Sequence, residues 1–173
     1  SPIDAAGRGT GLDDAGVRHK ADVIARALEL HRPDPRDAVG VLAAVGGFEI
    51  AAIAGLILGA AQRRRVVVLD GFISCSAALV ARVLEPASLD YVIYSHCSAE
   101  RGHRKMLDAL GARGTRRPLL DLEMRLGEGS GAAIGISLVE SAVRLYREMA
   151  TFSGAGVATS REKPAESRTA SES

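Results

Sequence analysis

The stretch RVVVLDG (65–71) decides the fold that this sequence predicts. A compact run of β-branched apolar residues that stops at an acid and a glycine is typical of a strand buried in a parallel sheet. Residues 90–95, DYVIYS, predict a second strand, and residues 118–122 a short third one. Because helical patterns alternate with these strands, we expect an α/β fold with a parallel, Rossmann-like sheet and flanking helices.

The helices are predicted from apolar spacing and from the residues that stop them. Asp13 or Asp14 is expected to cap the first helix, which should end after His31 because Pro33 follows. Residues 48–62 are apolar nearly all round, which predicts a helix packed between other elements. The remaining helices are expected at residues 37–44, 74–84, 100–110 and 132–149.

Length and composition exclude several classes of protein. The 173 residues suit one domain, expected at 1–152, and the polar, apolar-poor segment 153–173 predicts a disordered tail. Twenty-two basic against twenty-one acidic residues and 3% aromatics argue against a nucleic-acid partner. The longest apolar run, residues 50–61, is too short to cross a bilayer, so no membrane association is expected.

The cysteines and histidines indicate neither a disulfide framework nor a metal. Cys75 and Cys97 are only two, and the histidines lack the spacing of metal ligands. We therefore predict no metal and no cofactor, and a reducing cytoplasm fits the two thiols. Cys97 stands beside His96, but neighbours on an extended segment point to opposite sides, so a nucleophilic cysteine is disfavoured.

Ligands of parallel sheets bind at the carboxyl ends of the strands, where two polar residues are candidates. Asp70 closes the first strand; it either stabilises the start of the following helix or contacts a ligand. Ser98 follows the second strand and is either a helix cap or a ligand donor. For each of these two residues, the residue type alone does not decide between the structural role and the ligand-binding role.

Two glycine-rich turns offer further candidates. In Gly127-Glu128-Gly129, the glycines allow a close backbone approach, and partial desolvation of Glu128 would suit it to general-base work. A solvated loop glutamate is the alternative. The loop at residues 7–11 could cradle an anion with Lys20 nearby, although it matches no nucleotide-binding fingerprint and a solvated Lys20 is the default.

Taken in order along the chain, the motifs resemble one family, the nicotinate-nucleotide:dimethylbenzimidazole phosphoribosyltransferases of cobalamin lower-loop assembly. The resemblance runs from about Gly7 to Phe152. The segments that carry it are GRGTGLDDAG (7–16), RHK (18–20), GGFEIAAIAG (46–55), VVLDGF (67–72), YVIYSHCSAERGH (91–103), PLLDLEMRLGEGSGAA (118–133) and EMATF (148–152).

The resemblance implies a homodimeric cytoplasmic enzyme with a Rossmann-like sheet. It would move phosphoribosyl from nicotinate mononucleotide to 5,6-dimethylbenzimidazole, which gives α-ribazole 5′-phosphate and nicotinate. Glu128 would be the catalytic base and Leu126 would flank the benzimidazole. The implied substrate-binding residues are Lys20, Asp70, Ser98, Leu126, Gly127 and Gly129, whereas Glu49 is as readily structural.

The chain also departs from the family pattern. The family's upstream GEMGIGNT motif is absent, Arg101 stands where proline is usual, and residues 114–117 resemble a small insertion. We therefore expect the chain to correspond to the C-terminal half of such an enzyme, an incomplete portion of a larger domain. Two alternatives follow: a half that binds nucleotide or nicotinate without turnover, and a folded module that pairs with a missing half.

Overall fold

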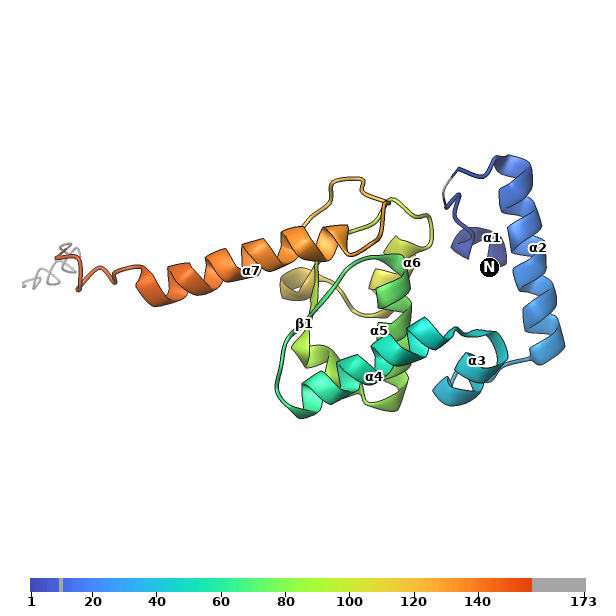
Figure 1. Ribbon diagram of the computed structural model, residues 1–173, viewed down its shortest axis with the longest axis horizontal. Coiled ribbons are helices and arrows are strands. Elements are labelled where there is room, and N and C mark those ends of the chain that lie inside the picture. The colour runs from blue at the N-terminus through green and yellow to red at the C-terminus, as the bar shows by residue number, and fades with distance from the viewer. Residues whose placement is uncertain (10, 157–173) are drawn as a thin grey trace, which may run out of the picture. The chain divides into compact units, whose positions relative to one another are not determined.

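The computed structural model describes residues 1–9 and 11–156, so Thr10 and residues 157–173 of the predicted tail lie outside the described residues. The described residues divide into two compact units, the first over residues 1–139 and the second from residue 140 onward. In chain order the elements are α1 (Pro2–Ala5), α2 (Asp14–His31), α3 (Ala38–Val45), α4 (Phe48–Gln62), β1 (Val67–Leu69), α5 (Phe72–Leu84), η1 (Pro86–Tyr91), β2 (Val92–Tyr94), α6 (His103–Ala109), η2 (Gly114–Arg116) and α7 (Ser130–Glu148) (Figure 1).

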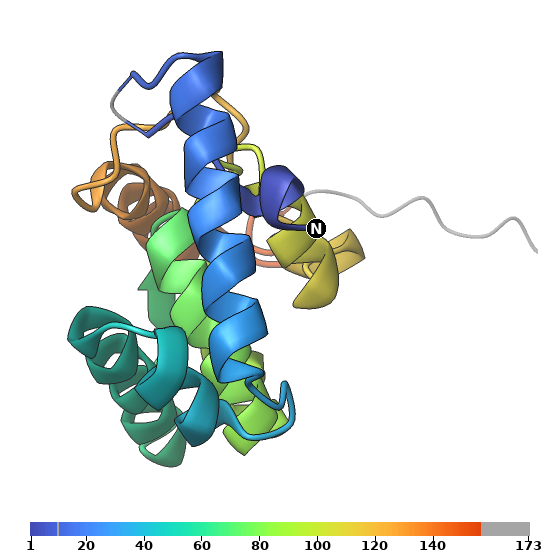
Figure 2. The same cartoon turned by 90° about the vertical axis from the view of Figure 1, so that its right-hand side faces the viewer.

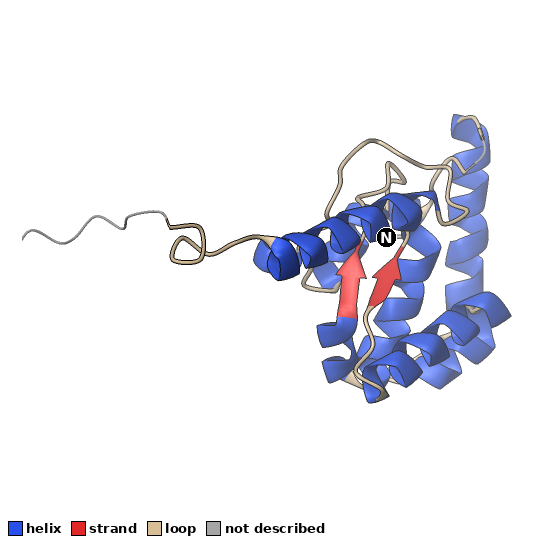
Figure 3. Ribbon diagram, turned by 60° about the vertical axis from the view of Figure 1, so that its left-hand side comes forward, coloured by secondary structure: helices blue, strands red, loops and turns tan. Residues whose placement is uncertain are grey.

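The sheet is parallel, as the sequence predicted. β1 pairs with β2 in the register Val67–Val92, Val68–Ile93 and Leu69–Tyr94, and the two arrows run side by side in Figure 3. The predicted third strand is wrong as a strand: residues 118–122 make a single parallel bridge, between His96 and Leu120. Pro118 lacks an N–H, which shortens the ladder that this segment can form beside β2.

The ends of the early helices follow from local chemistry. The Asp13 carboxylate accepts a hydrogen bond from the Gly16 N–H at 2.8 Å, so Asp13, not Asp14, is the cap of α2. Arg32 adopts a left-handed conformation with φ of 41° directly after His31, where the helix was predicted to end. Asp37 caps α3 in the same way through the Gly40 N–H at 2.9 Å.

Small side chains allow α4 and α5 to pack closely against one another. Ala77, Ala78 and Ala81 of α5 are wholly buried, and Ile57 of α4 packs against this group. Leu69 and Tyr94 join the same core from the strands. A core built of alanines leaves little room for added volume, so the spacing between α4, α5 and the sheet is tightly set.

α4 packs against other elements, as expected, but it is not buried on all sides. Only Ala54 and Ile57 of this helix are buried, whereas Phe48 is 95% exposed and Leu56 is 59% exposed. The reason is that α4 meets α5 and η1 along one stripe, and no described residue covers the opposite stripe. Apolar character all round a helix therefore does not by itself place it in the interior of this chain.

The first turns of α7, within residues 130–139, lie over the other face of the strands (Figure 3). A Cβ at Gly135 would come within 2.9 Å of the Ser95 Cβ and 3.4 Å of the Val68 Cγ1. This close approach accounts for glycine at position 135. The sheet is therefore covered on one face by α5 and on the other by the beginning of α7.

A separate small core joins the N-terminus to α2. Ala6 contacts Val17 and Ala21, which lie one turn apart on α2, and Ile24 packs beside them. Figure 2 shows α1 beside the upper part of α2. Within the described residues, no helix is both long enough and apolar enough to cross a membrane.

Candidate functional site

Asp70, at the carboxyl end of β1, binds the start of α7. Its Oδ1 accepts hydrogen bonds from the Gly131 N–H at 2.8 Å and the Ala132 N–H at 3.1 Å. The helix that directly follows Asp70 is α5, and no side-chain cap hydrogen bond forms at its start, Gly71. The structural alternative raised from the sequence thus named the wrong helix: the carboxylate stabilises α7, which begins sixty residues further along.

The predicted base lies in a turn of unusual backbone geometry. Gly127, Glu128 and Gly129 have consecutive φ values of 75°, 57° and 76°. Glycine adopts this left-handed conformation freely, but Glu128 is held in it at a cost of about 1 kcal/mol. The Ser130 hydroxyl closes the turn by donating to the Gly127 carbonyl at 2.7 Å. Strain of this kind concentrates at functional sites.

The side chains of this turn face solvent. Glu128 is exposed and Leu126 is 76% exposed. The desolvation that would suit Glu128 to proton abstraction is therefore not supplied by the described residues. The described residues instead fix the position of the turn, because Asp70 binds the start of α7, which directly follows it.

His96 and Ser95 support this arrangement, and reasoning from the sequence missed both. The His96 ring is 2% exposed and occupies the space where a Cβ at Gly131 would lie. Ser95 donates its hydroxyl proton to the Asp70 carbonyl at 2.9 Å, and its Oγ is 3.1 Å from the His96 Nδ1. The signal was present in SHCSAE (95–100), where the cysteine is more conspicuous than the histidine beside it.

Ser98 continues the same segment and is also buried. Its N–H donates to the His103 Nδ1 at 2.8 Å, and its hydroxyl accepts from the Glu100 N–H at 3.2 Å. The predicted cap role is therefore met in a turn rather than in a helix, because α6 begins only at His103. The hydroxyl keeps its own proton available for another acceptor.

Burial controls the titration of the neighbouring groups. Desolvation, with a smaller contribution from His96, lowers the pKa of His103 to about 4. The geometry agrees, because a neutral ring is needed for Nδ1 to accept the Ser98 N–H. Desolvation raises the pKa of the Cys97 thiol and brings the pKa of Cys75 to about 12, which leaves both as poor nucleophiles.

Lys20 ties α2 to the N-terminal glycine-rich loop. Its half-buried ammonium donates to the Gly7 carbonyl at 3.0 Å. The Glu100 carboxylate occupies the space where a Cβ at Gly7 would lie, so this loop also reaches the segment that follows Ser98. In the part of the chain that the structure describes, no hydrogen bond joins Lys20 to Asp70, Ser98 or Glu128. Thr10 of the loop lies outside that part.

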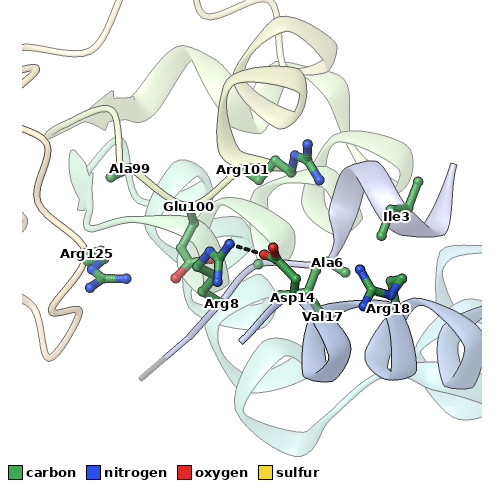
Figure 4. A pocket seen from close by; sticks show the side chains of 11 residues that line it. Ile3, Ala6, Arg8, Asp14, Val17, Arg18, Ala99, Glu100, Arg101 and Arg125 are labelled. Carbon is green, nitrogen blue, oxygen red and sulfur yellow. Dashed lines mark hydrogen bonds and ion pairs between the residues drawn. The ribbon is translucent and has the colours of Figure 1, made fainter. Parts of the chain in front are cut away.

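A cavity of about 630 Å³ opens beside this loop (Figure 4). Arg8 and Asp14, which both line the cavity, form an ion pair that Figure 4 draws as a dashed line. No set of three or more histidine, cysteine or carboxylate side chains is placed to hold a metal in the described part of the chain. The residues that line the cavity are Ile3, Ala6, Gly7, Arg8, Asp14, Val17, Arg18, Ala99, Glu100, Arg101 and Arg125.

The chain is similar to a set of much longer proteins. It is 55% identical over 156 residues to the nicotinate-nucleotide–dimethylbenzimidazole phosphoribosyltransferase of Chloroflexus aggregans, an alignment that covers 90% of this chain and 43% of the relative. The enzyme of the same name from Syntrophotalea carbinolica is 56% identical over 153 residues, which is 88% of this chain and 42% of the relative. The chain thus spans less than half the length of these relatives.

Solved structures give the same picture of the fold. The crystal structure of CobT from Thermus thermophilus superposes with a TM-score of 0.82 at 43% identity, covering 91% of this chain and 45% of that one. The family profile described as phosphoribosyltransferase matches residues 1–157. With sequence and fold in agreement over nearly all of its length, this chain belongs to that phosphoribosyltransferase family.

Proposed function

We propose that this chain carries the catalytic base of an enzyme that transfers phosphoribosyl from nicotinate mononucleotide to 5,6-dimethylbenzimidazole. The substrates come from the names of the relatives. The observation that carries the proposal is the position of Glu128, which stands in a strained turn whose following helix is anchored to the sheet by Asp70.

In the proposed reaction a benzimidazole nitrogen attacks the anomeric carbon of the ribose. The bond from that carbon to the nicotinate nitrogen breaks, and its electron pair leaves with nicotinate. Positive charge then grows on the attacking ring until its N–H proton is lost. Glu128 accepts this proton, so the products are α-ribazole 5′-phosphate, nicotinate and a protonated carboxyl group that returns its proton to water.

The other candidate residues divide into two roles. Leu126 offers an exposed apolar surface against which a benzimidazole ring would pack. Gly127 and Gly129 hold the turn open, and Ser98 keeps a hydroxyl proton free for the nucleotide. Lys20 acts through the loop that it binds at Gly7, and Asp70 acts by positioning α7.

A second candidate function is binding without turnover. The observation that favours it is the exposure of Glu128 and Leu126, since a working site would exclude water from the reacting groups. In that case the nucleotide binds this chain, and further polypeptide completes the site. By the same resemblance we also propose a homodimer that works in the cytoplasm.

Phosphoribosyl transfer by the full chain tests these proposals. The chain would be given nicotinate mononucleotide and 5,6-dimethylbenzimidazole, and α-ribazole 5′-phosphate followed by chromatography. We expect Glu128→Gln to lower the rate by about 100-fold or more, the usual contribution of a general base. Glu123→Gln is the matched control, because Glu123 is also exposed and also has a positive φ, of 54°.

Each outcome assigns a role. Product from the native chain and from Glu123→Gln, with loss in Glu128→Gln, supports the enzyme. Nucleotide binding by a folded chain that makes no product supports the second candidate. Equal rates in Glu128→Gln and the native chain would overturn the base assignment. Sedimentation equilibrium of the full chain tests the homodimer.

A further inference from the structure

His96 is buried where two helices begin. It is 2% exposed, and its ring atoms Nδ1, Cε1 and Cγ occupy the space in which a Cβ at Gly131 would lie. A Cβ at Gly71 would meet the same ring, at 3.2 Å from Cε1 and 3.4 Å from Nε2. Gly71 precedes α5, and Gly131 lies in the first turn of α7. One imidazole ring therefore packs against the starts of both helices, and both glycines make room for it.

Ser98 lies beside this ring. A Cβ at Gly71 would also meet the Ser98 Cβ, at 3.7 Å. His96 and Ser98 are two residues apart in an extended segment that pairs with Leu120, so their side chains point to the same side. The ring therefore lies near Ser98, the candidate nucleotide contact, and touches the helix start that follows Glu128.

Hydrogen bonds fix the ring to the end of β1. The Ser95 Oγ lies 3.1 Å from the His96 Nδ1 and donates its single proton to the Asp70 carbonyl at 2.9 Å. Because that proton is already used, the contact with His96 needs a proton on Nδ1, which is donated to the Ser95 oxygen. The Asp70 carboxylate in turn accepts the Gly131 N–H at 2.8 Å. Asp70 thus holds the ring through Ser95 and holds α7 directly.

We propose that His96 is a positioning residue, and that its ring sets the separation between the Glu128 turn and Ser98. Asp70 attracts the start of α7 to the sheet, and the ring limits how closely that start approaches. A hydrogen bond alone leaves a helix end free to tilt, whereas a buried ring in contact with both sides removes this freedom. The separation stands on the geometry, and its effect on transfer rests on the proposed function, since a misplacement of about 1 Å costs about 100-fold in rate.

Hydrogen exchange tests the separation without any turnover. Asp70 protects the N–H groups of Gly131 and Ala132, which exchange when α7 lifts away from the ring. A general loss of stability speeds exchange everywhere, so the rates are read relative to the Glu85 amide at the far end of α5. In the full chain we expect His96→Ala to raise this ratio by about 10-fold, equivalent to about 1.4 kcal/mol of local opening free energy.

Two further variants show whether the ring itself is responsible. Cys97→Ala is the matched control, because Cys97 is the next residue, is 6% exposed and packs in the main hydrophobic core, so the ratio should not change. His96→Asn keeps an N–H near the place of Nδ1 but leaves part of the ring volume empty, so we expect a smaller rise, of about 3-fold. Should His96→Ala not fold, His96→Asn against the native chain decides. An unchanged ratio in the His96 variants, or an equal rise in Cys97→Ala, would overturn the proposal.

Transfer kinetics test what the separation does for the proposed reaction. We expect kcat of folded His96→Ala to fall by about 10- to 100-fold, because the base is misplaced. The KM for nicotinate mononucleotide should stay within about 3-fold, because no proposed nucleotide contact is removed. A purely structural role would lower the folded fraction, measured by circular dichroism, and leave kcat of that fraction as in the native chain. Partial recovery of kcat in His96→Asn supports positioning, and native kcat in folded His96→Ala would overturn it.

Failure of the proposed function is distinguishable from failure of this inference. A native chain that makes no product removes the enzyme, while a selective rise in exchange in His96→Ala still supports the separation. Glu128→Gln should lose transfer and keep the native exchange ratio, because the contacts of Asp70 with α7 are intact. Unaltered transfer in Glu128→Gln together with the rise in His96→Ala would keep His96 as the residue that places the turn and remove Glu128 as the base.

Discussion

The Asp70 Oδ1 lies 2.8 Å from the backbone nitrogen of Gly131. This hydrogen bond joins the end of β1 to the beginning of α7. The same oxygen accepts from Ala132 at 3.1 Å. One carboxylate thus satisfies two of the backbone donors that an isolated helix end leaves without partners. Because the Glu128 turn directly precedes these residues, its place relative to the sheet depends on this contact.

Replacing Asp70 with alanine should destabilise the chain. We expect the free energy of unfolding to fall by about 1–2 kcal/mol, the usual cost of removing a helix cap. Urea denaturation followed by circular dichroism measures this change. Asp22→Ala is the control, because Asp22 is exposed on α2 and should shift the free energy by no more than about 0.5 kcal/mol. Equal effects of the two substitutions would contradict the capping role.

Gly131→Ala should destabilise the chain through a steric clash with His96. The added methyl would overlap a buried ring that has little room to move, and we expect a loss of about 2 kcal/mol or more. Gly55→Ala gives the opposite sign: nothing lies within 4 Å of the new methyl, and alanine favours helix by up to about 1 kcal/mol. A double variant with His96→Ala should recover part of the Gly131→Ala loss.

Glu128→Gly should separate stability from activity. Glycine adopts the left-handed backbone at position 128 without strain, so the free energy of unfolding should rise by about 0.5–1 kcal/mol while transfer is lost. Glu140→Gly, inside α7, should instead cost about 1 kcal/mol, because glycine is a poor helix former. Thermal melts of both variants give the comparison. A less stable Glu128→Gly protein would show that the turn is not strained.

The buried His103 should make stability depend on pH between about 4 and 6.5. Its pKa is about 4 in the folded chain, against an ordinary value of 6.5, so the unfolded chain binds more protons in this window. Stability is therefore fully present above pH 6.5 and declines as the pH falls toward 4, by about 3 kcal/mol. Urea titrations at several pH values measure the slope.

Two substitutions identify the group responsible for that slope. His103→Gln removes the titrating ring and should flatten the dependence on pH in this window. His19→Gln, at an exposed position of α2, should leave the slope as it is in the native chain. A slope that persists in His103→Gln would assign the effect to another group.

The elements that depend on neighbours in sequence were predictable, and the contacts between distant segments were not. β1 and the ends of α2 follow from a β-branched run, a capping aspartate and a proline, all local signals. The partner of Asp70 was missed because Gly131 is 61 residues away. The burial of His96 was missed because the sequence alone does not show that its ring packs against Gly131, a residue far away in the chain.

For the proposed site, sequence reasoning found the residues but not their surroundings. Glu128 and its glycines were singled out as a turn, and the structure adds the strain and the anchoring of α7. The expected desolvation of Glu128 depended on tertiary contacts, which the described residues do not make.

The large sequence separation between Asp70 and Gly131 has a consequence for the kinetics of folding. Closing a loop of 61 residues costs entropy on the order of 4 kcal/mol, and the chain loses this entropy before the contact can stabilise it. Contacts of high sequence separation form late in folding when they are not part of the nucleus. The β1–β2 pair and α5 can assemble from nearer segments, so the Glu128 turn takes its shape only on a sheet that already exists.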